Sequence, residues 1–147
     1  MGSVRHRHLG VIVIAAVGLG VMAGATEAEG SKRELVGDRY RSISAVRDGE
    51  SHDLVEGTRI RVRFRRQDGN ELVSWRAGCN HFGARVKVRP RRLVTGRSEG
   101  TAVGCNDALH RQDRWLARFF RRDPRWVRRG TRLRLRSGDD VIRFRRR

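Results

Sequence analysis

The stretch Thr58-Arg-Ile-Arg-Val-Arg-Phe-Arg65 decides the fold class, because apolar and basic side chains alternate along it without interruption. Successive side chains of a strand point to opposite faces, so this pattern predicts a strand with one buried face and one face covered by arginine. The same alternation recurs around Val86 and Val88 and around Leu133 and Leu135. The sequence therefore predicts a domain built mainly from strands.

Turn-forming pairs separate the alternating stretches and predict hairpins. Asp48-Gly49, Asp68-Gly69 and Ser137-Gly138 each combine a small polar residue with glycine, as two-residue turns require. The segment 78–83 is rich in small residues and is interpreted as a loop. We expect about seven short, mostly antiparallel strands in a barrel-like or strongly curved sheet.

The hydrophobic period changes once, late in the chain. From Asp107 onward, apolar residues recur at spacings of three and four, which predicts one amphipathic helix at about 107–121. Asn106 or Asp107 can cap its start, and the pair Asp123-Pro124 ends it. The fold class is therefore α+β, in a single domain.

The first 25 residues have the layout of a secretory signal peptide. A basic front precedes an uncharged run from Leu9 to Ala25, with small residues before the cleavage point. Cleavage after Ala28 is a second option, and an uncleaved anchor is the alternative, since about 17 apolar residues are just enough to span a membrane. No cysteine is available there for lipid attachment. We expect a signal peptide at 1–25, a linker at 26–34 and the folded domain at 35–147, in a protein that is secreted, periplasmic or held in the cell envelope.

The charge is strongly positive. The chain carries 34 basic and 16 acidic residues, a net charge of +18, which produces a field that attracts polyanions. For an exported protein we expect acidic polymers or lipid head groups as partners, and no specific nucleic acid. The alternative is a solvated arginine-rich surface without a dedicated ligand. The candidate anion-binding residues lie on two alternating stretches and are Arg59, Arg61, Arg63, Arg132 and Arg134.

The two cysteines occur in matching tripeptides, Gly78-Cys79-Asn80 and Gly104-Cys105-Asn106. One disulfide between them is the most economical interpretation for an exported chain. Two alternatives remain at this stage. Cys105 at a helix start is a candidate thiolate with His81 or His110 as base, and the same four residues are an atypical zinc set.

Other signatures of catalysis are missing from the sequence. It contains no phosphate-binding glycine loop, nucleophile elbow or zinc-protease motif. Asp139 and Asp140 are interpreted as turn residues, His52 as exposed and His110 as a helix-surface residue. We expect no enzyme activity, no catalytic residue, no metal, no cofactor and a monomer.

These residues together resemble a META domain of the HslJ-like kind. The resemblance rests on residues 78–83, on Thr101 to Cys105, on the helix through Trp115-Leu116 and on the closing stretch 130–135. The opening Leu35-x-Gly-x-x-Tyr40 is similar to the family's opening, with tyrosine where the family usually has tryptophan. The resemblance covers about 35–145.

The resemblance implies a small, compact mixed α/β unit of the kind found in exported or envelope-associated bacterial proteins, some of them linked to stress. It offers no catalytic residues to transfer. Cys79 and Cys105 match the positions at which many members of the family hold a cysteine pair. We therefore expect a structural or interaction role in the envelope, most simply toward an envelope component.

Overall fold

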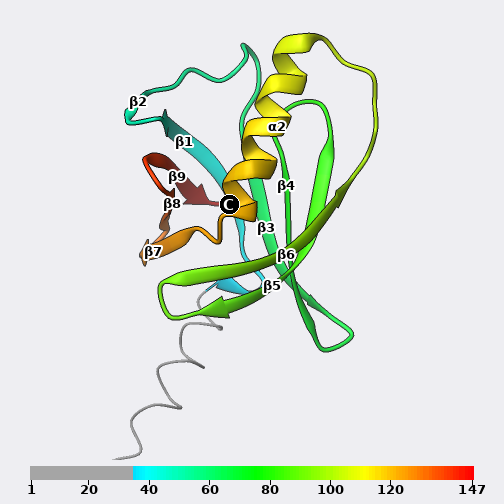
Figure 1. Ribbon diagram of the computed structural model, residues 1–147. Coiled ribbons are helices and arrows are strands. Elements are labelled where there is room, and N and C mark those ends of the chain that lie inside the picture. Colours follow the sequence, from blue (N-terminus) through cyan, green and yellow to red (C-terminus); the bar gives the residue numbers. More distant parts are fainter. Residues whose placement is uncertain (1–34) are drawn as a thin grey trace, which may run out of the picture.

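The computed structural model describes residues 35–147, so the expected signal peptide and linker lie outside the described residues (Figure 1). Nine strands and one helix follow one another along this part of the chain. Their bounds are β1 Arg39–Arg47, β2 Glu50–Ser51, β3 Arg61–Gln67, β4 Asn70–Arg76, β5 His81–Arg89, β6 Arg92–Gly100, α2 Asp107–Arg121, β7 Arg125–Arg129, β8 Arg132–Ser137 and β9 Asp140–Arg146.

The strands form one antiparallel sheet that closes on itself. Their order is β2-β1-β3-β4-β5-β6-β7-β8-β9, and β1 also pairs with β9, which makes a barrel that excludes only the two-residue β2. The seam between β6 and β7 is the weakest, with the single registered pair Arg92 and Arg125. Helix α2 connects these two strands.

Alternation along each strand builds the core. Val62 and Phe64 of β3 are buried, whereas the arginines between them are exposed. The opposite parity holds on β8, where Leu133 and Leu135 are buried between exposed arginines. On these strands one residue in two fills the barrel interior, as the sequence pattern predicts, whereas β6 buries only Leu93.

Two-residue turns set the register of the first two hairpins. Asp48 and Gly49 both have positive φ, as do Asp68 (φ 49°) and Gly69 (φ 76°). Consecutive positive φ values characterise the type I′ turn, whose twist matches that of paired strands. The Asp-Gly pairs therefore act as the sequence indicates.

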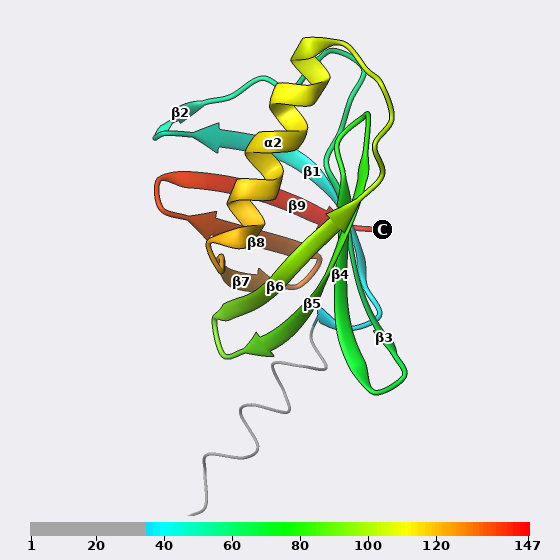
Figure 2. The same cartoon turned by 45° about the vertical axis from the view of Figure 1, so that its right-hand side comes forward.

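Helix α2 runs across the barrel, between β7–β9 on one side and β4–β6 on the other (Figure 2). Asn106 caps its start by accepting the Leu109 N–H through its side chain. Its apolar face is buried, and the Phe120 ring stacks on Trp75 with ring centroids 4.2 Å apart. The indole N–H of Trp115 donates to Asp140 Oδ2 at 3.0 Å, so a carboxylate at the start of β9 anchors the helix.

The predicted α+β class, the barrel-like sheet and the helix bounds are confirmed, but the number of strands is higher than about seven. The expected loop 78–83 already contains the start of β5 at His81. There β5 pairs with β6 through Phe82 and Gly100, and no alternation of apolar and polar residues marks this part of the strand. Gly100 leaves the space that the Phe82 ring occupies, since a Cβ at Gly100 would lie 2.5 Å from that ring. Within residues 35–147, no helix is long and apolar enough to cross a membrane.

Candidate functional site

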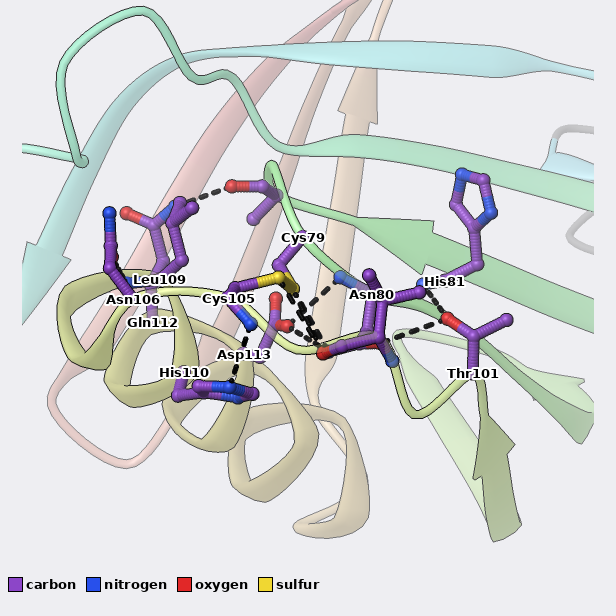
Figure 3. The surroundings of a disulfide bond; sticks show 12 residues. Cys79, Asn80, His81, Thr101, Cys105, Asn106, Leu109, His110, Gln112 and Asp113 are labelled. Atoms are coloured by element: carbon purple, nitrogen blue, oxygen red, sulfur yellow. Dashed lines mark hydrogen bonds between the residues drawn. A yellow bond between two sulfur atoms is a disulfide. The ribbon is translucent and has the colours of Figure 1, made fainter.

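Cys79 and Cys105 are joined in a disulfide that ties the end of β4 to the start of α2 (Figure 3). Their Cα atoms are 6.3 Å apart and their sequence separation is 26. The bond therefore closes the segment that contains the whole β5–β6 hairpin. It also fixes the start of the hairpin next to the start of the helix.

Asn80 organises the surroundings of this bond. Its backbone N–H and its side-chain amide both donate to Asp113 Oδ2 at 3.0 Å. Its Oδ1 accepts from the Thr101 hydroxyl at 3.0 Å and from the Val103 N–H at 2.8 Å. One buried side chain, in the link between β4 and β5, thus holds the segment after β6 and the helix together.

Gln112 is the second buried polar residue on the inner face of α2. Its Oε1 accepts the Val55 N–H at 2.9 Å, and its amide donates to Thr58 Oγ1 at 3.1 Å and to the Ala77 carbonyl. Because all these groups are satisfied within the protein, burying them costs little. The polar residues around the disulfide form a network that braces the fold.

The histidines do not assemble a catalytic or metal site with the cysteines. His110 Nε2 accepts the Cys105 N–H at 3.2 Å, and the His81 ring points away from the disulfide (Figure 3). His52 packs its ring against Trp115, with centroids 4.9 Å apart. Among residues 35–147, no three His, Cys, Asp or Glu residues are placed to hold a metal ion. A disulfide sulfur is also not available as a thiolate nucleophile or ligand.

The exposed face of the barrel carries a continuous row of basic residues, which we call the basic girdle. Each member lies directly opposite the next on the neighbouring strand. In spatial order from β7 through β8, β9, β1, β3 and β4 to β5, the girdle consists of Arg129, Arg132, Arg145, Arg41, Arg61, Arg76 and His81.

The girdle arginines have no counter-charge within the described part of the chain. The ion pairs there involve other arginines, such as Arg136 with Asp139 at 3.7 Å. Asp38 is within 3.6 Å of Arg128 and 3.7 Å of Arg146, at the end of the barrel. Like charges directly opposite each other on a sheet repel, so the girdle is a concentrated and unneutralised positive strip.

Part of the girdle lines a groove of about 500 Å³ on β1, β3, β4 and β5. Arg41, Arg61, Arg76 and His81 line it, and the short side chain of Ser74 leaves room between them. A volume of this size is in the range of ligand-binding clefts.

The candidate anion-binding residues inferred from the sequence are distributed over different places. Arg61 and Arg63 line the groove, and Arg132 and Arg134 line a smaller hollow of about 270 Å³ on β8 and β9. Arg59 lies before β3 and donates to the carbonyl of Thr58.

Sequence reasoning did not include Arg41 and Arg76 among the anion-binding candidates and gave His81 only as a candidate base or zinc ligand. Opposition across strands depends on register, which single-strand patterns do not give. Sequence reasoning also missed the buried partner pair Asn80 and Asp113. One signal was available for the asparagine: it follows a cysteine in both copies of the repeated tripeptide. Both asparagines in these copies satisfy backbone N–H groups in the structure.

At the end of the barrel, the Tyr40 hydroxyl donates to Asp38 Oδ2 at 3.0 Å. Burial, followed by this hydrogen bond and the charge of Asp38, raises the pKa of Tyr40 well above its ordinary value near 10. The phenol is therefore neutral at physiological pH and serves as a structural donor.

Comparison with known proteins gives one family and two structural relatives. The META domain family matches residues 33–147. A protein from Burkholderia xenovorans whose structure was solved by NMR is 14% identical, with a TM-score of 0.65 over 97% of each chain. A second NMR structure is 16% identical, with a TM-score of 0.58 over 77% of this chain and 92% of the other. At these identities the two structures show that the fold is shared. No curated protein matches the chain.

Proposed function

Because the chain belongs to the META domain family, we propose that it is an exported domain without catalytic activity that acts by binding a partner in the cell envelope, in a structural or stress-related role. The Cys79–Cys105 disulfide is the observation that carries this proposal. These are the only two cysteines of the chain, and structural disulfides persist in oxidising compartments outside the cytoplasm.

The surroundings of the disulfide support a bracing role and no chemistry. Asn80 and Gln112 use their polar atoms on neighbouring backbone and side chains. The His110 ring nitrogen that a base would need accepts a backbone N–H. The nearest exposed feature is the basic girdle, whose His81 end directly follows the Asn80 network. The disulfide thus fixes the start of β5 and one end of a charged surface.

The test is the location and thiol state of the protein in its host. Cells are quenched with acid, fractionated and treated with a maleimide mass tag before and after reduction. We expect the protein outside the cytoplasm, with Cys79 and Cys105 labelled only after reduction. A variant without residues 1–25 is the control and should stay inside with both thiols labelled. A full-length protein found in the cytoplasm with two labelled thiols would contradict the proposal.

A second candidate function is binding of anionic polymers or lipid surfaces through the arginine-rich outer faces. The observation that favours it is the net charge of +18 together with the register that aligns arginines across strands. Retention on several polyanions of equal charge density tests it. Selectivity among them supports a dedicated surface, and equal retention on all of them indicates bulk charge alone.

A further inference from the structure

We propose that the basic girdle binds a linear phosphodiester polymer without bases, namely a polyol-phosphate chain. The polymer would lie across the part of the girdle on β9, β1, β3, β4 and β5. This inference rests on the proposed interaction role and names its site and ligand class. The register carries it: Arg145, Arg41, Arg61, Arg76 and His81 are opposed pair by pair on five neighbouring strands.

The electrostatics of the row call for an anion of several charges. Arg61 has an arginine opposite it on each side, Arg41 on β1 and Arg76 on β4. In the part of the chain that the structure describes, none of the three forms an ion pair. The guanidinium group binds phosphate oxygens in a bidentate manner and keeps its charge at any physiological pH. One phosphate placed between two of these arginines would relieve the repulsion of both.

The shape of the site favours an elongated ligand. Neighbouring strands are about 4.8 Å apart, so the five positions extend over roughly 20 Å. The groove of about 500 Å³ covers only the part on β1, β3, β4 and β5, and the row continues beyond it to β9. A single phosphate could neutralise one or two members of the row. A chain with one charge per repeat could follow all of them.

The described surface offers little to a nucleic acid base. Sites for single-stranded nucleic acid combine a basic groove with exposed aromatic rings on which bases stack. Here Tyr40 and Trp75 line the groove but are 1% and 2% exposed, because their rings belong to the core. Phe82 also lines the groove, but its ring is half-buried and already stacks on Trp75, with centroids 5.8 Å apart. The exposed large apolar residues of the described chain are Ile43, Val94 and Val103, none of them aromatic. The chemistry therefore favours a phosphate chain on polyol units over a nucleic acid.

Two triple variants with equal charge test the site in the full chain. R41Q/R61Q/R76Q removes the centre of the girdle. R85Q/R97Q/R114Q removes three exposed arginines from β5, β6 and α2 that are not opposed to one another in the sheet. Each removes three positive charges from a chain of net charge +18. The probe is fluorescent synthetic poly(glycerol phosphate) of about ten repeats, and binding is measured by anisotropy over a range of salt concentrations.

We expect the girdle triple to weaken binding at least tenfold, and the control triple less than threefold. Each phosphate contact contributes about −0.7 to the slope of log affinity against log salt on a flexible chain, so the girdle triple should reduce the magnitude of the slope by about 2. Equal losses in the two triples would overturn the site and leave bulk charge. If the girdle triple melts early, the single variant R61Q is compared with R85Q, and R61Q should reduce the magnitude of the slope by about 0.7 while R85Q leaves it unchanged.

Further arms of the experiment distinguish the source of the phosphate. Single-stranded DNA of equal charge, inorganic phosphate and phosphatidylglycerol vesicles are measured beside the polymer. DNA or vesicles bound as tightly as poly(glycerol phosphate) would overturn the assignment of the ligand, as would the absence of polymer binding. The location and thiol tests do not depend on this result, so a failure of the girdle leaves the proposed exported interaction domain standing. A protein found in the cytoplasm with free thiols would contradict the proposed function whatever the polymer experiment gives.

Discussion

Asn80 is central to the polar network near the disulfide, because its side-chain amide bonds to helix α2 and to the stretch 101–103 after β6. Asn80→Ala would leave Asp113, a carboxylate 3% exposed, without the side-chain donor that it now has. It would also leave the Val103 N–H without its acceptor. A buried polar group that loses a partner costs about 1–3 kcal/mol, and this applies to Asp113, whereas Val103 is 55% exposed and water can reach it. We expect the variant to lose about 2 kcal/mol in the free energy of unfolding, measured by urea denaturation.

The control is Asn70→Ala. Asn70 is exposed at the start of β4, and its side chain donates only to the Asp68 carbonyl, so its loss should cost less than about 0.5 kcal/mol. Equal costs for the two variants would show that the Asn80 network does not brace the fold.

Tyr40 makes the stability dependent on alkaline pH. Its pKa is raised in the folded protein, chiefly by burial and then by the hydrogen bond to Asp38. The stability that the proton provides is therefore complete below the unfolded pKa of about 10 and is lost as pH rises toward the folded value. Tyr40 is the only tyrosine of the chain, so the tyrosinate absorbance near 295 nm comes from this residue alone, and Tyr40→Phe supplies the tryptophan change on unfolding that is subtracted. We expect ionisation only together with unfolding, and a weaker loss of stability above pH 10 in Tyr40→Phe. A free titration near pH 10 in the folded protein would contradict this.

At the scale of elements, the local sequence pattern was sufficient to predict the helix, whereas the start of β5 depends on the register between strands. The helix bounds could be predicted because the apolar stripe, the Asn106 cap and Asp123-Pro124 are all local signals. The start of β5 could not, because His81 and Phe82 join the sheet by pairing with β4 and with the distant Gly100. The same limit applies to the site. The sequence shows arginines on one face of a strand, but only the pairing shows which of them stand opposite each other.

Removing a charge from the centre of the girdle should stabilise the protein. Arg61 lies between Arg41 and Arg76 on its two neighbours, and directly opposed like charges are destabilising. Arg61→Gln should raise the free energy of unfolding by about 0.5 kcal/mol at low salt. The gain should disappear near 1 M salt, where screening acts within about 3 Å. Arg85→Gln, opposite Leu72 on β4, is the control and should show no such gain. Parallel salt responses of the two variants in thermal melts would refute the electrostatic account.

At the scale of the whole molecule, the barrel has one weak seam, and the disulfide lies at the far end of the element that bridges it. β6 and β7 share a single registered pair, supplemented by the Leu93 N–H to the Pro124 carbonyl at 2.9 Å and the Trp126 N–H to the Arg91 carbonyl at 3.0 Å. Helix α2 fills this side with buried aromatic rings. The Cys79–Cys105 bond fixes the start of the helix to the end of β4.

Removing that bond should lower stability without abolishing the fold. A cross-link that closes a segment of this length contributes on the order of 3–4 kcal/mol, mainly by restricting the unfolded chain. The barrel core is independent of it, because the buried residues of α2 pack on Trp75 and Asp140. We expect Cys79→Ser/Cys105→Ser to keep the wild-type circular dichroism at 25 °C and to melt about 10–15 °C lower, given about 4 °C per kcal/mol for a domain of this size.

Reductant should lower the melting temperature of the wild type to the same value and leave that of the double variant unchanged. An unfolded double variant would mean that the helix depends on the bond for docking, and an unchanged melting temperature would mean that the bond does not brace the barrel.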